Sequence, residues 1–383
     1  METAELIELI SRGEDSRHQF KVNISNQDSL AGEIVAFANT EGGRIFIGVT
    51  DSGETRGLVA GDIDRLNQMI SNASSESVVP PVNVRTENVQ HPSGIVMVVT
   101  VPNGINKPYM DKRGSIWLKT GADKRRAISR EEIQRLFQQS SLLHADETPI
   151  GGTGVSDLDL PYFESFFERQ YDEKVEDQDV SLLELLQNMN LARNNVLNLA
   201  GVLLFSKKPE FRLPAFIVKA VAFPGTEMED EHYLDSKDIV GKLADVFQQT
   251  LAFLGANTAA RQGDRSVNTT GESEIPRIVW EELFVNALIH RDYYITAPIR
   301  VLVFTDRVEI ISPGRLPNNL TVENILAGNS NIRNPILASF GAKILPYRGL
   351  GSGVRRALKA YSDIHFKNDL EGNLFTAIIR RNA

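Results

Sequence analysis

The sequence has no cysteine among its 383 residues. This absence excludes disulfide bonds, thiolate zinc sites and cysteine nucleophiles. Long apolar runs are absent as well, since no segment approaches the roughly 18 residues that a membrane-spanning helix needs. Residues 1–20 lack the basic and then apolar segments of a signal peptide. We therefore expect a cytoplasmic protein that does not associate with membranes.

An excess of positive charge is also lacking. The chain has 41 lysines and arginines against 50 aspartates and glutamates, which gives a net charge of −9. This balance excludes a uniformly cationic coat for nucleic acid but leaves room for a local basic patch. The length exceeds that of one ordinary hydrophobic core and predicts more than one domain.

Apolar periodicity and turn residues divide the chain into three parts. Residues 1–140 mix helices and strands, residues 141–272 form a linker and a mixed α/β connecting region, and residues 273–383 form a third part. The predicted fold class is α/β of the α+β kind. Expected helices are 29–39, 129–139, 160–171, 182–189, 241–254 and 277–291. Expected strands are 44–49, 96–101, 115–119, 202–205, 215–222, 299–304, 308–311 and 374–380.

Three polar side chains are spaced along one face of the expected helix 277–291. Glu282, Asn286 and His290 follow one another at intervals of four residues. A carboxylate can orient or deprotonate a water molecule, and a carboxamide oxygen one turn away can bind Mg²⁺. The same pattern also fits an ordinary polar helix face.

Glycines mark two further segments of the third part. Gly314 follows Ser312 and Pro313 at the end of a strand, where it lets the backbone approach a ligand. Gly349, Gly351 and Gly353 precede a helix, and their backbone N–H groups are suited to holding phosphates. Alone, this glycine string also fits a simple helix cap.

Together and in this order, the segments resemble the GHKL ATPases, which have the Bergerat fold. Glu282 and Asn286 match the N-box of that family, and the three glycines match its second glycine box. The strings NALIHRDY (286–293), EIISPGRLP (309–317), IRNP (332–335) and GLGSGVRRAL (349–358) are closest to a divergent GHKL domain of bacterial Schlafen-like transcriptional regulators. This resemblance covers roughly residues 275–381.

The resemblance implies an α/β sandwich that binds ATP with Mg²⁺ and forms a homodimer or a higher homo-oligomer. Ser312 occupies the place where most GHKL proteins carry the aspartate that reads the adenine amino group, so the resemblance does not extend to adenine selectivity. Binding with or without weak hydrolysis remains open. The implied roles are Mg²⁺ binding for Asn286, water orientation for Glu282, and nucleotide contact for His290, Gly314, Gly349, Gly351 and Gly353.

Two strings in the first part resemble the Schlafen/AlbA-type DNA-binding domain over roughly residues 10–140. They are AFANTEGGRIFIGVTD (36–51) and IWLKTG (116–121), the latter preceded by KPY (107–109). Cations cluster around the second string, interleaved with Tyr109 and Trp117, as in surfaces that neutralise phosphates and stack on bases. A solvated loop beside a buried tryptophan is the alternative. The expected DNA- or RNA-binding residues are Lys107, Lys112, Arg113, Lys119, Lys124, Arg125 and Arg126.

Some Schlafen relatives are RNases with a cluster of three carboxylates. Glu14 fits the first place of that cluster and Asp51 the third, but Gln19 stands in the second. An amide does not supply the negative charge that holds a divalent metal. In the simpler interpretation, Glu14 caps a helix and Asp51 forms a turn.

The leading hypothesis is a nucleotide-switched nucleic-acid-binding protein, either a transcriptional regulator or a factor in defence against foreign nucleic acid. It combines a Schlafen/AlbA-like domain (1–140), a connecting region (141–272) and a GHKL-like ATP-binding domain (273–383). The first alternative is a metal-dependent Schlafen-type RNase regulated by the GHKL-like domain. The second is a non-catalytic interaction protein with a degenerate nucleotide site.

Overall fold

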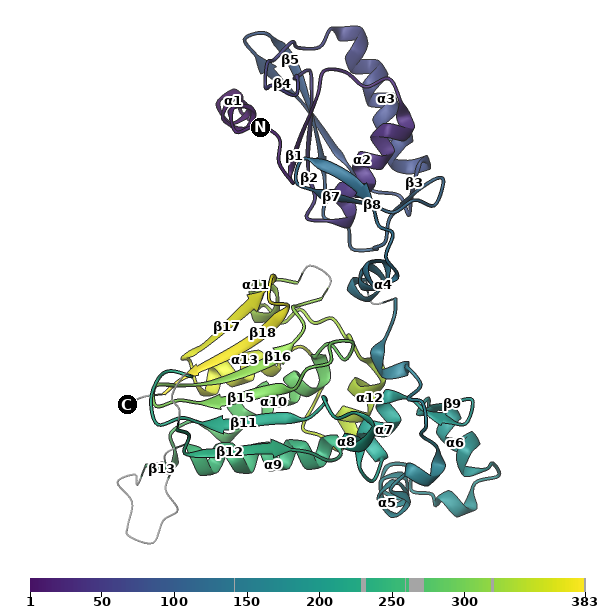
Figure 1. Cartoon of the computed structure of the whole chain (residues 1–383), viewed down its shortest axis with the longest axis vertical. Helices are drawn as coiled ribbons and strands as arrows, with labels where there is room; N and C mark the ends of the chain where they lie inside the picture. The colour runs from purple at the N-terminus through teal and green to yellow at the C-terminus, as the bar shows by residue number, and fades with distance from the viewer. Residues whose placement is uncertain (141, 229–231, 259, 262–271, 318–319, 382–383) are drawn as a thin grey trace. The chain divides into compact units, whose positions relative to one another are not determined.

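The computed structural model describes residues 1–140, 142–228, 232–258, 260–261, 272–317 and 320–381 (Figure 1). The chain divides into two compact units, Met1–Leu143 and His144–Ala383. Both mix helices and strands, which confirms the expected fold class. No helix in the described ranges combines the length and the apolar character needed to cross a membrane.

The first unit is built on a four-stranded sheet in the order β1-β2-β5-β4. Strand β1 is parallel to β2, and the other pairs are antiparallel. Because side chains alternate between the faces of a strand, Ile45 and Ile47 join one core with helix α2, while Phe46 joins another with helix α1. The strands are β1 (His18–Lys21), β2 (Gly43–Ile47), β4 (Arg85–His91) and β5 (Gly94–Val101). The helices are α1 (Thr3–Ser11), α2 (Gln27–Asn39) and α3 (Ala60–Glu76).

A small hairpin packs against α2 in the same unit. It consists of β7 (Trp117–Thr120) and β8 (Asp123–Arg126), and it precedes helix α4 (Arg130–Gln139). The buried Asn39 side chain donates to the carbonyls of Tyr109 and Trp117 over 2.9 and 3.0 Å. These bonds attach residues 109 and 117, which belong to the KPY and IWLKTG segments of the sequence, to the end of α2. A second pair of short strands, β3 (Val78–Val79) and β6 (Met110–Asp111), also contacts α2.

The second unit contains a six-stranded sheet in the order β12-β11-β15-β16-β18-β17, in which only β11 and β15 run parallel. Helices α9, α10 and α13 cover one face of it (Figure 1). Val301, Ile310 and Ile379 point to that face and enter the main core. The strands are β11 (Val218–Ala222), β12 (Asp235–Ile239), β15 (Ile299–Val303), β16 (Arg307–Pro313), β17 (Ile364–Asp369) and β18 (Leu374–Arg380). The helices are α9 (Leu243–Asn257), α10 (Arg277–His290) and α13 (Gly353–Ala360).

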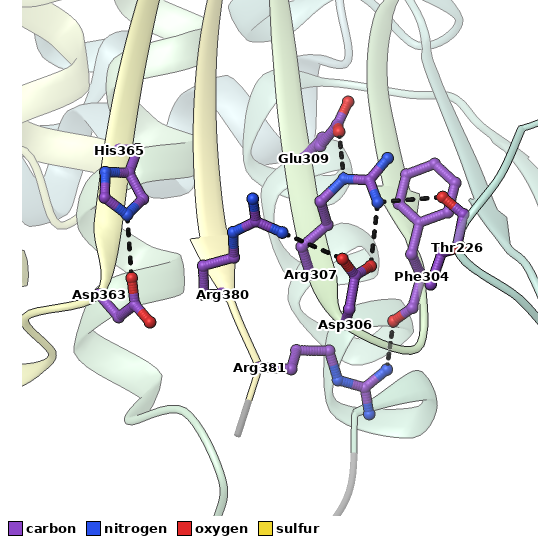
Figure 2. Close-up of polar contacts among 9 residues, drawn as sticks. All are labelled: Thr226, Phe304, Asp306, Arg307, Glu309, Asp363, His365, Arg380 and Arg381. Atoms are coloured by element: carbon purple, nitrogen blue, oxygen red, sulfur yellow. Dashed lines mark hydrogen bonds and ion pairs between the residues drawn. The ribbon is translucent and has the colours of Figure 1, made fainter. Parts of the chain in front are cut away.

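Charged side chains fix the turn between β15 and β16, at the end of the sheet where β16 begins (Figure 2). Asp306 accepts from Arg307 over 2.9 Å and from Arg380 on β18 over 3.0 Å. Arg381 donates to the carbonyl of Phe304 over 2.6 Å. These bonds join three neighbouring strands at one end, so that β16 carries Ser312 to a fixed position at its other end.

Further helices and short strands complete the second unit. They are α5 (Leu160–Tyr171), α6 (Leu182–Asn188), α7 (Leu199–Phe205), α8 (Pro209–Arg212), α11 (Val322–Leu326), α12 (Pro335–Ile344), the short strands β9 (Ala192–Arg193), β10 (Val196–Leu197), β13 (Ala260–Arg261) and β14 (Glu272–Ser273), and the 3-10 turns η1 (Ala145–Glu147), η2 (Val155–Asp157) and η3 (Val175–Asp177). The expected strand 202–205 is wrong, because this run is the end of helix α7. Asn198 caps that helix by accepting from the N–H of Gly201 over 2.8 Å.

The three-part domain division remains a prediction. In the structure, β11 from the expected connecting region pairs with β15 from the expected third domain, so both belong to one sheet. Residues 262–271, on the N-terminal side of the expected boundary at 272, lie outside the described ranges.

Candidate functional site

The second unit has a pocket of about 1050 Å³, counting the open space at its mouth. The lining comes mainly from α10, the end of β16, the loop before α13 and the first turn of α13, with further residues from α11, the segment 329–331 and strands β17 and β18. It includes every residue that the sequence assigned to the nucleotide site: Glu282, Asn286, His290, Gly314, Gly349, Gly351 and Gly353.

Helix α10 supplies the polar face of the pocket. Asn286 donates from Nδ2 to the carbonyl oxygen of Glu282 over 2.7 Å. This bond uses the amide nitrogen, so Oδ1 is the ligand atom that the side chain retains. Since amide oxygens are ligands for Mg²⁺, the position of Asn286 fits the predicted metal contact.

His290 lies about one turn beyond Asn286 on α10. Burial, and to a smaller extent the nearby charge of Arg333, lower the pKa of His290 to about 4, against the opposing effect of a hydrogen bond to the Asn331 backbone. The ring is therefore neutral at pH 7. Its Nε2 lies 3.1 Å from the hydroxyl of Tyr347, and burial raises the pKa of that phenol, so the hydroxyl keeps its proton at pH 7. This end of the pocket thus carries hydrogen-bonding groups without charge.

Glu282 is held by an arginine that the sequence analysis did not single out. Its Oε1 accepts from Nε and Nη2 of Arg356 on α13 over 2.7 and 2.6 Å. Glu282 is only 8% exposed. The pairing joins helices separated by 74 positions in the chain. Arg356 stands three residues after the last glycine of the string, which is a signal for a phosphate contact, but its partner cannot be read from the sequence.

The glycine string forms the opposite wall. Gly349 and Gly351 both have φ of +65°, which favours glycine, and a Cβ on Gly351 would overlap the carbonyl oxygen of Gly328. A Cβ on Gly353 would lie 2.6 Å from Oε2 of Glu282. A side chain at position 353 would therefore fill the space between the loop and α10. Gly353 also begins α13, so the N-terminus of that helix faces the pocket.

Two residues at the end of β16 shape the inner wall. Ser312 is buried, and its hydroxyl lies 3.4 Å from the carbonyl of Ala287 on α10. Gly314 has φ of +101°, and a Cβ there would lie 2.5 Å from both Asp292 and Arg333. A glycine is required because three segments cross at this point.

The charged groups of the lining favour an anionic ligand. Arg315, Arg348 and Arg356 line the pocket, and Glu282 is the one carboxylate among the described lining residues. After the pair between Glu282 and Arg356, two positive charges remain. Phosphate groups match guanidinium groups in charge and geometry.

In the first unit, two of the predicted nucleic-acid-binding cations are buried. Lys107 donates to the carbonyl of Thr40 over 3.0 Å. Lys119 donates to Oε1 of Gln19 over 2.6 Å and to the carbonyl of Ala122. Burial lowers the pKa of Lys119. Both side chains fill internal positions and do not present their charge to an external phosphate.

The other five cations reach the surface, four of them beside carboxylates. Lys112 and Arg113 pair with Asp28 over 2.6 and 3.1 Å. Trp117 is half-buried and lies 5.1 Å from the guanidinium of Arg126. Arg126 is exposed and has no carboxylate partner among the residues that the structure describes. The remaining pairs are Lys124 with Glu33 and Arg125 with Glu132.

The two weak nuclease candidates lie in different surroundings. Oε1 of Glu14 accepts from Nε2 of Gln19 over 2.5 Å and from the N–H of Phe20 over 2.6 Å. Asp51 is exposed in the turn after β2. Across the described part of the chain, no group of three or more histidines, cysteines, aspartates or glutamates is placed to hold a metal ion.

Comparison with known proteins connects these sites to two families. Residues 14–128 match the family described as "Schlafen, AlbA_2". Residues 296–374 match the family described as "Putative ATP-dependent DNA helicase recG C-terminal". The second match begins at residue 296, after the end of α10, so it does not include Glu282 and Asn286. The assignment of these two residues to the site rests on the geometry of the pocket. No curated protein matches the chain.

Two solved structures are similar to parts or all of the chain. The DIP2311 protein from Corynebacterium diphtheriae is 21% identical over 99% of this chain and 80% of its own, with a TM-score of 0.45. The second is the N-terminal domain of a "Putative ATP-dependent DNA Helicase RecG-related Protein" from Nitrosomonas europaea. It is 22% identical over 34% of this chain and 91% of its own, with a TM-score of 0.26. The family matches confirm the resemblance at both ends of the sequence. The chain therefore carries a Schlafen AlbA_2 domain at its N-terminus and a RecG-type, HATPase-like domain towards its C-terminus.

Proposed function

We propose that this protein binds nucleic acid through its first unit and that ATP with Mg²⁺, bound in the pocket of the second unit, controls this binding. The observation that carries the proposal is the pocket itself. It gathers Glu282, Asn286 and the three glycines of residues 349–353 around a surplus of arginine. An ATPase-like family match in the same unit supports nucleotide as the ligand.

In this proposal, the backbone of residues 349–353 and the N-terminus of α13 hold phosphate oxygens, with Arg315 and Arg348 adding charge. Asn286 offers Oδ1 to the metal. Mg²⁺, when bound, neutralises charge on the phosphates. Glu282 is the residue that would orient a water molecule if ATP is hydrolysed.

The nucleic-acid surface in this proposal is the basic hairpin, which we define as Lys112, Arg113, Lys124, Arg125 and Arg126 around Trp117. The cations would neutralise phosphates, and their present carboxylate partners would be replaced by the ligand. A homodimer or higher homo-oligomer would let nucleotide occupancy set how several hairpins face one strand or duplex. Transcriptional regulation and defence against foreign nucleic acid are both compatible with this arrangement.

Thermal unfolding with ATP, ADP and GTP, each with and without Mg²⁺, tests the nucleotide half of the proposal. A ligand that binds only the folded state raises its melting temperature. We expect a Mg²⁺-dependent shift with ATP that the Asn286→Ala variant lacks. If no nucleotide shifts the melting temperature of the wild-type protein, the pocket is not a nucleotide site. Fluorescence anisotropy with labelled DNA and RNA, with and without ATP, then tests the control of nucleic-acid binding.

A further inference from the structure

Arg356 has all three guanidinium nitrogens engaged within the pocket. Nε and Nη2 bind Glu282, and Nη1 donates to the hydroxyl of Ser352 over 2.8 Å. Both partners line the pocket. The guanidinium therefore lies at the surface that a ligand would contact, and its present partners belong to that surface.

The two members of the pair differ in accessibility. The side chain of Glu282 is 10% exposed, whereas that of Arg356 is 27% exposed. A buried carboxylate is stable as an anion only when it is paired, so Arg356 is what stabilises Glu282 in the ligand-free pocket. Arginine also has the longer and more mobile side chain, so it is the member that can exchange its partner.

The position of this pair along α10 indicates which part of a nucleotide it meets. Glu282 and His290 are eight residues apart on one helix, which corresponds to roughly 12 Å. His290 and Tyr347 form the uncharged end of the pocket, which suits a base. Glu282, Arg356 and Gly353 form the other end, beside the glycine loop, which suits phosphates.

We propose that Arg356 distinguishes nucleoside triphosphates from diphosphates by exchanging Glu282 for the terminal phosphate. This inference rests on the proposed function and names a specificity-determining residue for it. A terminal phosphate carries more negative charge than one carboxylate and accepts the same two-pronged contact from a guanidinium. A triphosphate thus draws Arg356 towards its terminal phosphate, whereas a diphosphate leaves the pair with Glu282 intact.

Calorimetric titration of the full chain with ADP and with the β,γ-imido analogue of ATP, both with Mg²⁺, tests this inference. In the Arg356→Gln variant we expect the affinity for the triphosphate to fall by about ten- to a hundredfold, the range for a hydrogen bond to a charged group. The affinity for ADP should stay within about twofold. In the Glu282→Gln variant, Arg356 has no competing carboxylate, so we expect the triphosphate to bind more tightly than to the wild type.

Arg355→Gln is the matched control, because Arg355 is the exposed neighbour on α13 and bonds the carbonyl of Ala327 instead of Glu282. It removes the same charge and should change neither affinity. ADP binding by Arg356→Gln shows that the variant pocket is folded. Equal losses for both nucleotides, an unchanged triphosphate affinity, or loss of ADP binding would overturn the inference while the proposed function stands. Failure of the wild type to bind either nucleotide would overturn both.

Discussion

At the scale of single residues, His290 makes the second unit sensitive to acid. The folded-state pKa of about 4 lies below the ordinary value of 6.5. In the unfolded chain this histidine takes up a proton near pH 6.5, whereas in the folded chain it does so only near pH 4. The free energy of unfolding therefore decreases as pH falls from 6.5 to 4. We expect the melting temperature of the wild type to fall between pH 6.5 and pH 4 by more than that of His290→Asn. The exposed His365, paired with Asp363 (Figure 2), provides the control, and His365→Asn should follow the wild type. Parallel curves for all three proteins would contradict the assignment.

Asp146 has the opposite linkage. Its Oδ2 accepts from the N–H groups of Ile336 and Leu337 at the start of α12, over 2.7 and 3.0 Å. Burial outweighs these bonds and raises the pKa of Asp146 from 3.8 to about 6. Here the folded state holds the proton longer than the unfolded state, so stability falls as pH rises from about 4 to 6.

The corresponding experiment compares the free energy of unfolding of the wild type and Asp146→Asn across this range. The amide keeps the acceptor for both N–H groups but does not ionise. The difference between the two proteins should grow by about 2 kcal/mol between pH 4 and pH 6.5, in favour of the variant, since each pKa unit corresponds to roughly 1.4 kcal/mol. A difference that does not depend on pH would show that the carboxyl is not the titrating group.

Single residues also show what sequence alone could predict. The residues assigned to the nucleotide site line one pocket, and their spacing on one helix and one loop is local information that a sequence provides. Their roles remain predictions. Lys107 and Lys119 were grouped with surface cations, yet they are buried. A lysine has the same letter in the sequence whether its charge meets solvent or a carbonyl such as that of Thr40, because only tertiary packing decides between the two.

At the scale of elements, the glycine loop before α13 is the part most sensitive to substitution. We expect Gly351→Ala to destabilise the second unit and to abolish the ATP-induced thermal shift, because it combines an unfavourable φ with overlap at the Gly328 carbonyl. Gly349→Ala is the matched control. Its φ is the same, but its Cβ would meet only a ring carbon of Tyr347 at 3.6 Å. That variant should lose only about 1–2 kcal/mol of stability, the penalty for a left-handed conformation. Equal effects of the two substitutions on the ATP shift would mean that backbone conformation, and not close packing against Gly328, is what the loop needs.

The elements that could be predicted are those specified by local patterns. Helix α5 and strand β18 have the predicted bounds, and α4 begins one residue after the start of the expected helix 129–139. Helix α7 was mistaken for a strand because a short, fully buried apolar run looks the same in both structures. The parallel pairing of β11 with β15 was also not predictable, since the helix α9 and many other residues separate the two strands.

At the scale of the whole molecule, both proposed ligands are anionic, although the net charge of the chain is −9. The pocket has a local surplus of arginine. In the proposal, four of the five cations of the basic hairpin exchange their carboxylate partners for phosphates. Local placement of charge, and not its total, decides what each surface binds. Nucleic-acid binding by the first unit should therefore depend strongly on salt.

The dependence of nucleic-acid affinity on salt can locate this surface. For duplex DNA, the logarithm of the affinity falls with the logarithm of salt concentration by about 0.9 per neutralised phosphate. We expect the double variant Arg125→Gln/Arg126→Gln to reduce this slope by up to about 1.8. The double variant Lys207→Gln/Lys208→Gln removes the same charge from the exposed surface of the second unit and should leave the slope unchanged. If ATP controls binding, adding it should alter the slope of the wild type and not merely its intercept, because a switch that changes how many hairpins engage changes the number of neutralised phosphates. A slope that neither the arginine substitutions nor ATP alters would place the nucleic-acid contact elsewhere on the chain.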